Sequence, residues 1–514
     1  MREVSMALAA SPLVQAFIAT TRFGLGPRPG DLASVASDPR GWLASQLERP
    51  ETPSAIAALP PPQDQIRRFV ALRRDLIEAR KRLGRADAAA AAQPARAPAL
   101  ASSAMEATPM REDMSSAAQA MPAMAMSRDA AGVDAAKTMD AQLTAPLRAI
   151  YLDEMEARAR AAIESPTPLQ ERLVAFWSNH FTVSIQRGGI AGLCGPFERA
   201  AIRPHVCGRF VEMLNAVMHH PAMLIYLDNA RSIGPDSIAA RRNPEKHFGI
   251  NENLGRELLE LHTLGVDSGY TQRDVIEMAR MLTGWTVGGP KQPDAGAFRF
   301  EPRLHEPGDK LFLGAVYREG GMAEAEMALA TLARHPATAH HLATKIARHF
   351  ISDQPPEAAV ARLAAVYRAT DGDLAAVTRA AIAEPEAWQN PLAKVKSPQE
   401  FMIATLRATG FVPEDARVLV NSARVMGQAP FAAPSPAGWG DSAAAWLGPD
   451  SLMHRIEWSQ AVGRRIGRTV PALELAHATI GPVAKKETMD AIAHARDPAD
   501  RLTMLLASRE FQRR

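Results

Sequence analysis

The residues best suited to chemistry gather in one helix-length stretch, residues 251–265. It reads Asn-Glu-Asn-Leu-Gly-Arg-Glu-Leu-Leu-Glu-Leu-His-Thr-Leu-Gly and carries two Asn, three Glu, one Arg and one His. At roughly 100° per residue, a helix collects five polar side chains on one stripe, namely Asn253, Arg256, Glu257, Glu260 and Thr263. Leucines cover most of the remaining circumference, with His262 among them. The pattern predicts a helix that presents carboxylates either to water or to a pocket.

Two interpretations of this stripe stay open. In the first it is a solvated face, with Arg256 and Glu260 as an ion pair one turn apart. In the second it is buried, because the leucine arc leaves little room for solvent. Two desolvated carboxylates repel, so a cation must lie close or one must hold a proton. We then expect Glu257 and Glu260 to share a polar cluster with Asn253, Arg256 and a His, most simply His180.

Two further histidines belong to the candidate set. His180 ends an apolar helix in the segment Phe176-Trp-Ser-Asn-His-Phe181, where an imidazole can cap carbonyls, bind a metal or act as acid or base. A lone His in such a position more often has a structural role than a catalytic one. His305 stands in the turn His305-Glu-Pro-Gly308, from which it could reach over a helical pocket. The candidate catalytic residues are therefore Glu257, Glu260, His180, His262 and His305.

These residue types suit two classes of function. Carboxylates with imidazole can bind a divalent metal ion, and a buried Glu can act as a base. The chain lacks His-Glu-x-x-His, and Glu257-x-x-Glu260 is not the Glu-x-x-His of di-iron bundles. One prediction is a metal-assisted or acid/base enzyme of hydrolase type. The other is a binding or assembly protein in which the same residues form a buried network that fixes helix packing.

The elements that must position these residues are mainly helices. The 514 residues are 47% hydrophobic and only 5% aromatic, and Ala and Leu dominate, which favours helix over sheet. We expect an all-α, multi-helix globular fold with one small β-hairpin near 297–315. There Phe298-Arg-Phe300 and Lys310-Leu-Phe-Leu313 flank the turn at His305.

A change in composition divides the chain. From residue 86 to 140 it consists largely of Ala, Met, Ser and Pro, without an aromatic residue. Such a stretch cannot bury enough surface to offset its ordering entropy, so a flexible low-complexity insertion is predicted. It separates an N-terminal helical segment of the main domain, 1–85, from the rest of that domain, 141–514, which holds the Asn/Glu/His motif.

Charge and hydropathy limit the partners and the location. The net charge is +3, from 59 basic and 56 acidic residues, and no basic run predicts a nucleic-acid partner. No stretch reaches the roughly 18 apolar residues of a membrane span. Within Met1–Thr21, Pro12 and Gln15 interrupt the apolar run that a signal peptide needs. We therefore favour a cytoplasmic location over export.

Several segments of the chain form a pattern that is found in one bacterial family. Its core is Asn251-Glu-Asn through Val275, followed by Leu282-Thr-Gly-Trp285. Further parts of the pattern are Arg22-Phe-Gly-Leu-Gly26, Phe176–Phe181, His220-Pro-Ala-Met-Leu224, Lys396-Ser-Pro398 and Met426-Gly-Gln428. Together these segments resemble the domain of unknown function 1800 family. The resemblance covers nearly the whole chain apart from the Ala/Met insertion. The turn His305-Glu-Pro-Gly-Asp-Lys310 departs from the family's usual His-Asp-x-Gly, which leaves the role of a carboxylate there open.

The resemblance implies a helical fold and no assigned activity. Many members look exported and are encoded beside proteins of a second family, number 1501, that resembles sulfatases and alkaline phosphatases. A protein of that kind is therefore an expected partner. The lack of a clear signal segment in this chain argues against an exported location.

Overall fold

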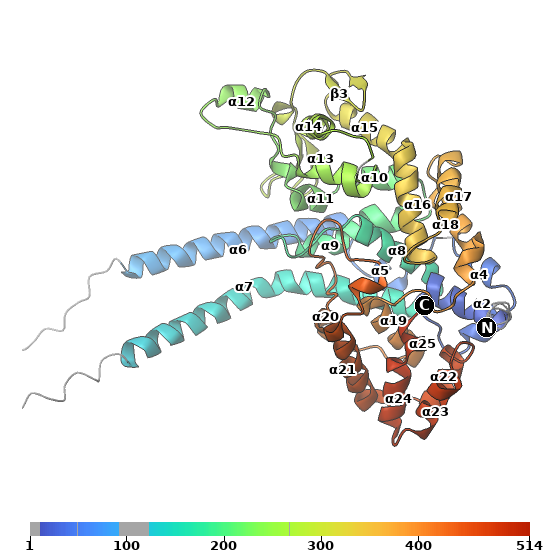
Figure 1. The fold of residues 1–514 in the computed structure, drawn as a ribbon. Coiled ribbons are helices and arrows are strands. Elements are labelled where there is room, and N and C mark those ends of the chain that lie inside the picture. Colours follow the sequence, from blue (N-terminus) through green and yellow to red (C-terminus); the bar gives the residue numbers. More distant parts are fainter. Residues whose placement is uncertain (1–10, 49, 92–122, 267) are drawn as a thin grey trace, which may run out of the picture.

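The protein is mainly helical. A computed structural model describes residues 11–48, 50–91, 123–266 and 268–514 (Figure 1). In this part of the chain 62% of the residues are helical, in 24 helices, beside two antiparallel sheets of two strands each. The predicted fold class is thereby confirmed. No helix in the described ranges is both long and apolar enough to cross a membrane.

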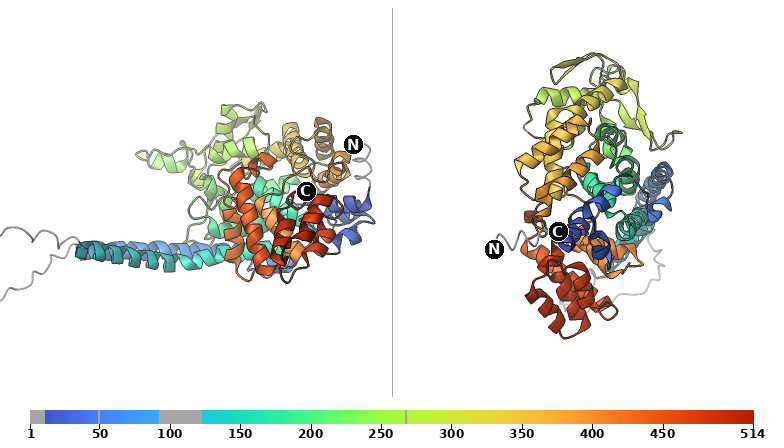
Figure 2. Two further views of the ribbon diagram at one scale, coloured as in Figure 1. Left: turned by 60° about the horizontal axis from the view of Figure 1, so that its bottom comes forward. Right: turned by 90° about the vertical axis from the view of Figure 1, so that its right-hand side faces the viewer.

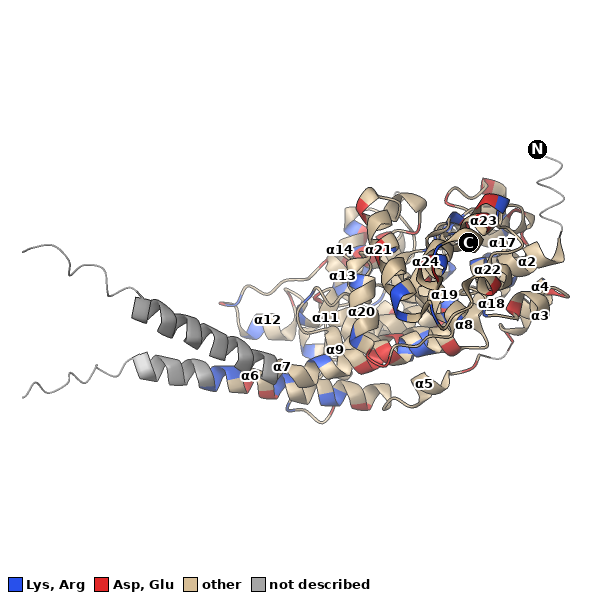
Figure 3. Ribbon diagram, turned by 90° about the horizontal axis from the view of Figure 1, so that it is seen from below, with Lys and Arg blue, Asp and Glu red and all other residues tan. Residues whose placement is uncertain are grey.

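The N-terminal part consists of four short helices and the first of two long ones. They are α2 (Pro12–Ile18), α3 (Asp31–Val35), α4 (Pro39–Ser45), α5 (Ser54–Ala57) and α6 (Pro62–Ala91). The second long helix is α7 (Ala123–Glu164), which packs against α6 where both leave the body (Figures 1 and 2). Charges of both signs line their described stem (Figure 3). Helices thus enter the stretch 86–140 from both ends. Residues 92–122 lie outside the described ranges, so the flexible insertion stays a prediction.

The middle of the chain forms the centre and the upper part of the molecule in Figure 1. Its helices are α8 (Pro168–His180), α9 (Ala191–Phe197), α10 (Phe210–Met218), α11 (Pro221–Tyr226), α12 (Ile238–Arg242), α13 (Asn253–Glu257) and α14 (Gln272–Met281). Helix α13 continues into a π-helical turn, η5 (Leu258–His262), so the helix predicted within 251–265 is present. Helix α14 begins at a capping box, in which the Thr271 amide donates to Asp274 at 2.8 Å.

Strand is confined to two hairpins. Strand β1 (Trp285–Val287) pairs with β2 (Phe298–Phe300), and β3 (Lys310–Phe312) pairs with β4 (Ala315–Tyr317). The predicted pairing of 298–300 with 310–313 is wrong. The segment between them is no free turn, because His305 and Glu306 are buried. The Glu306 amide donates to the Thr283 hydroxyl at 2.8 Å, which ties this segment to the end of α14.

The remaining helices form two groups. Helices α15 (Met322–Arg334), α16 (Pro336–Phe350), α17 (Glu357–Ala369) and α18 (Leu374–Ala383) pack in sequence order. The lower group in Figure 1 comprises α19 (Pro398–Thr409), α20 (Ala416–Val425), α21 (Pro449–Ile466), α22 (Ala472–Thr479), α23 (Lys486–His494), α24 (Pro498–Ala507) and α25 (Arg509–Gln512). Both α19 and α20 pack against α7, which joins this group to the body.

Helix α8 is buried on nearly every side. Trp177, Phe181 and Phe210 stack in one core cluster, and Trp177 is only 1% exposed. A helix surrounded in this way has no solvent face for its polar residues. Asn179 and His180 therefore lie inside the molecule, where each polar atom needs a partner.

One arginine closes the end of α7. The last carbonyls of a helix have no partner within it, and Arg407 of α19 supplies one. Its Nη1 donates to the carbonyls of Ala162 and Ile163 at 3.1 and 3.0 Å, and its Nε donates to Gly26 at 2.9 Å. This buried side chain connects the N-terminal loop, α7 and α19.

We expect Arg407→Met to lower the free energy of unfolding by roughly 2–4 kcal/mol, because the carbonyls of Gly26 and Ala162 lose the donor that Arg407 provides. Denaturant unfolding followed by circular dichroism measures this loss. Arg417→Met is the matched control, since Arg417 is exposed and pairs only with Asp415 in the described structure. Equal midpoints for the two variants would contradict the role given to Arg407.

Candidate functional site

A polar cavity of about 310 Å³ brings several of the sequence motifs together. It lies between α8, α16, the start of α19 and the loop that precedes α21. Lining residues come from four motif segments, Arg22–Gly26, Phe176–Phe181, Lys396–Pro398 and Met426–Gln428. Its polar walls are formed by Arg158, Arg172, Asn179, His180, Lys345, Arg348, His349, Gln399, Glu400, Gln428 and Asp441.

Asn179 holds the loop that covers the cavity. Its side-chain nitrogen donates to the Trp439 carbonyl at 2.9 Å, and its oxygen accepts from the Trp439 amide at 2.8 Å. Gly438 passes so close that a Cβ there would lie 2.4 Å from the Asn179 carbonyl oxygen, at a φ of +80°. Trp439 and Trp446 then pack with ring centres 6.0 Å apart in the cavity wall.

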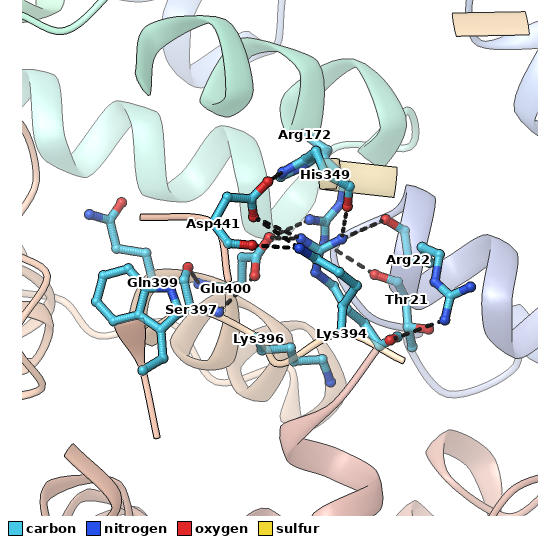
Figure 4. Close-up of polar contacts among 12 residues, drawn as sticks. Thr21, Arg22, Arg172, His349, Lys394, Lys396, Ser397, Gln399, Glu400 and Asp441 are labelled. Carbon is cyan, nitrogen blue, oxygen red and sulfur yellow. Dashed lines mark hydrogen bonds and ion pairs between the residues drawn. The ribbon is translucent and has the colours of Figure 1, made fainter. Parts of the chain in front are cut away.

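An imidazole and a carboxylate form a dyad at the cavity. His349 Nδ1 lies 2.8 Å from Asp441 Oδ2 (Figure 4). Burial alone would raise the pKa of Asp441, but His349, Lys394 and Arg514 together hold it well below its usual value. Burial lowers the pKa of His349, and the charge of Asp441 only partly opposes this. His349 is therefore neutral near pH 7, with Nδ1–H donating to Asp441.

This tautomer leaves Nε2 of His349 with its lone pair. The nitrogen is buried and has no hydrogen-bond partner in the described structure. A neutral imidazole oriented by a carboxylate through Nδ1 is the arrangement of a general base. His349 and Asp441 can therefore accept a proton from a group bound at Nε2.

Lys345 and Arg348 supply positive charge on the same helix. Lys345 precedes His349 by one turn of α16, and no hydrogen bond or ion pair of its amino group occurs in the described ranges. Burial lowers the pKa of Lys345 to about 8, with Asp441 opposing the shift. Arg348 lies exposed at the cavity wall and likewise has no ion-pair partner among the described residues. Two free cations beside a base suit an anionic ligand.

On the opposite wall of the cavity the charged side chains form ion pairs with one another and hold the surrounding segments together. Glu400 forms an ion pair with Arg172 (Figure 4) and a second one, at 3.3 Å, with Arg514. Burial opposes ionisation of Glu400, but the two arginines lower its pKa to about 2. Arg172 also donates to the Thr21 carbonyl at 3.1 Å. These contacts attach the N-terminal loop and the end of the chain to α8 and α19.

Of the predicted catalytic residues, only His180 lines this cavity. Its Nε2 donates to the carbonyl of His262 at 3.2 Å, while its Nδ1 is buried without a partner. Burial, followed by the charge of Lys345, lowers the pKa of His180 well below its ordinary value. His262 lies behind it in the core, and burial lowers the pKa of His262 to about 3. The two imidazoles are close, with ring centres 5.9 Å apart.

Glu257 and Glu260 do not join His180, so the predicted common cluster is wrong. Glu260 pairs with Arg256 of its own helix at 3.5 Å and stays partly exposed. Glu257 lies with Asn253 at another cavity of about 470 Å³, where burial and then Glu260 raise its pKa. The physical reason is the π-helical turn at 258–262, which inserts a residue and changes the phase of the stripe.

His305 belongs to a third cluster. Lys310 Nζ lies 2.6 Å from Glu324 Oε2, and His305 Nε2 lies 3.4 Å from the other oxygen of that carboxylate. Burial opposes ionisation of Glu324, but its hydrogen bonds with His305 and Lys310 lower its pKa to about 2. The carboxylate left open at this turn is Glu306, which stands where the family usually has Asp. It is buried, accepts a hydrogen bond from the Asp236 amide at 3.0 Å and lies 3.6 Å from Arg280. This cluster connects the hairpin of β3 and β4 to α15, and none of its residues lines the cavity at His349.

Sequence reasoning missed Lys345, His349 and Asp441 as site residues. Their signal was weak: a Lys and a His one turn apart, and an Asp that follows a Gly-Trp-Gly turn. Among the described residues, no group of three or more His, Cys, Asp or Glu side chains could hold a metal ion. The residues present suit proton transfer and anion binding.

Comparison with known proteins identifies the family. The family model described as a protein of unknown function, DUF1800, matches residues 18–513. The chain belongs to this family. Neither the curated proteins nor the solved structures contain a match. Four of the segments that resemble DUF1800 sequences meet at the cavity, so the cavity is the candidate functional site of this family member.

We expect Asn179→Ala to release the loop at Trp439, because both hydrogen bonds that fix its backbone are lost. Hydrogen–deuterium exchange of residues 433–441 should become faster, while exchange in α8 before residue 176 stays slow. Asn421→Ala, at an exposed position of α20, is the control. Unchanged exchange of the loop in Asn179→Ala would show that other contacts hold it.

Proposed function

We propose that the cavity is the active site of an acid/base enzyme that hydrolyses a small anionic substrate. The observation that carries the proposal is the combination on one helix of a neutral, carboxylate-oriented His349 with the unpaired Lys345. Environments that push two pKa values apart mark the acid and the base of a pair. Here the base is His349, and the cation that binds or protonates the substrate is Lys345.

The roles follow from the contacts. Arg348 and Lys345 attract the anionic group, and neither has to give up an ion pair with a described residue to do so. Asp441 keeps the tautomer of His349 and stabilises the imidazolium that forms when Nε2 takes a proton from water. His180 is the sequence-predicted residue that enters this proposal, since its unpartnered Nδ1 belongs to a residue lining the same cavity.

A binding or assembly role beside a sulfatase- or phosphatase-like protein of family 1501 is the second candidate. One observation favours it. Leu452, Met453 and Ile456 lie exposed on α21 at helical spacing, and exposed apolar groups of this kind mark protein interfaces. A partner that acts on anionic esters would be consistent with a cavity that binds an anion.

We expect turnover of at least one anionic ester among 4-nitrophenyl phosphate, 4-nitrophenyl sulfate and 4-nitrophenyl succinate, with a bell-shaped pH profile. Activity should rise with pH below 6.5, because His349 with its lowered pKa must be neutral. It should fall through about pH 8 as Lys345 loses its proton. His349→Asn keeps a donor near Asp441 but removes Nε2, and should lower kcat/KM about 10²- to 10⁴-fold.

Two lysine variants complete the experiment. Lys345→Met should raise KM and remove the alkaline limb, whereas Lys486→Met, at an exposed position of α23, should change neither. Turnover that is insensitive to His349→Asn would contradict the proposed base. Absence of turnover with all three esters would favour the binding role.

A further inference from the structure

A second, apolar cavity continues from the first. Its volume is about 70 Å³, and Leu25, Arg158, Ala175, Gln399 and Glu400 line both cavities. We call this second cavity the annex. The walls that belong to the annex alone are mostly aliphatic, formed by Met155, Ala159, Ala162, Val174, Met402, Ile403, Leu419, Val420 and Pro430.

The carboxylates at the annex are neutralised. Glu171 forms an ion pair with Arg203, and Glu198 accepts hydrogen bonds from Arg158 and Ser178, each at 2.8 Å. Neither carboxylate is therefore free to bind a polar group of a ligand in the annex. The interior of the annex therefore favours hydrocarbon over water, because a water molecule needs two or more polar partners.

A polar rim separates the annex from the main cavity. Arg158 donates to Gln399 at 3.2 Å, and Gln399 in turn donates two hydrogen bonds of 2.9 Å to Gln428, one from its backbone amide and one from its side-chain nitrogen. The Arg158 guanidinium also lies 5.4 Å from the ring centre of Phe431. A ligand that reaches from one cavity to the other must place its polar part at this rim and its apolar part beyond it.

We infer that the substrate is an amphiphile: an anionic head group bound at Lys345 and a short, unbranched alkyl tail held in the annex. This inference rests on the proposed function and names its substrate class. A cavity of about 150 Å³ takes up benzene, so about 70 Å³ holds about three carbon atoms. The annex would thus select chain length, while Lys345 and Arg348 select charge.

The test is the affinity of linear carboxylates, from acetate to octanoate, measured by calorimetry with the full chain. Affinity should rise about fourfold for each methylene that enters the annex and level off after about three. Ala159→Leu fills the annex and should abolish the rise while the affinity for acetate stays unchanged. Ile403→Ala enlarges the annex and should extend the rise by one or two carbons.

The control variant is Ala358→Leu, the same substitution at an exposed position of α17, which should change nothing. If acetate binds through Lys345 but affinity does not depend on chain length, the annex inference is wrong and the proposed anion site stands. If affinity rises with chain length but neither Ala159→Leu nor Ile403→Ala alters that rise, the tail binds elsewhere. This result also overturns the inference. If no carboxylate binds, or if Lys345→Met leaves binding unchanged, the proposed function fails as well.

Discussion

The ion pairs of Glu400 with Arg172 and Arg514 are the interaction on which the rest of the site depends. A buried carboxylate is stable in its charged form only when cations and hydrogen bonds surround it, and here one arginine comes from α8 and the other is the last residue of the sequence. Arg172 also holds the carbonyl of Thr21, and Arg514 donates to the carbonyl of His349 at 2.9 Å. One buried charge thereby fixes the N-terminal loop, α8, α16 and α19 relative to one another.

This network also explains why neighbouring groups differ in charge. Lys394 and Arg514 lie near Asp441 and keep it ionised, so Asp441 can orient the imidazole of His349. The same surplus of positive charge and the low local dielectric disfavour further protonation, which keeps His349 neutral. Lys345 lies beyond this network without a partner in the described structure. His349 can therefore act as a base, and Lys345 remains a cation without an ion-pair partner in the described structure.

The sequence predicted the helices better than it predicted which segments pack against each other. The apolar pattern predicted a helix that ends near His180, as α8 does, because this signal is local. The groups at the cavity come from distant segments: His349 and Asp441 are 92 residues apart, and Asn179 and Trp439 are 260 apart. Periodicity shows which side chains share a helix face but not which segment packs there. In residues 251–265 the polar side chains do not share the helix face that a regular repeat predicts, because the π-helical turn at 258–262 interrupts that repeat.

The protonation state and tautomer of His349 test the account most directly. Nitrogen-15 NMR of the protein labelled at its 14 histidines, with His349→Asn to assign the signal, reports both ring nitrogens. The account predicts a neutral ring at pH 7, with the proton on Nδ1 and a free lone pair on Nε2, that becomes charged only below pH 6.5. An imidazolium at pH 7, or a neutral ring with its proton on Nε2, would contradict it.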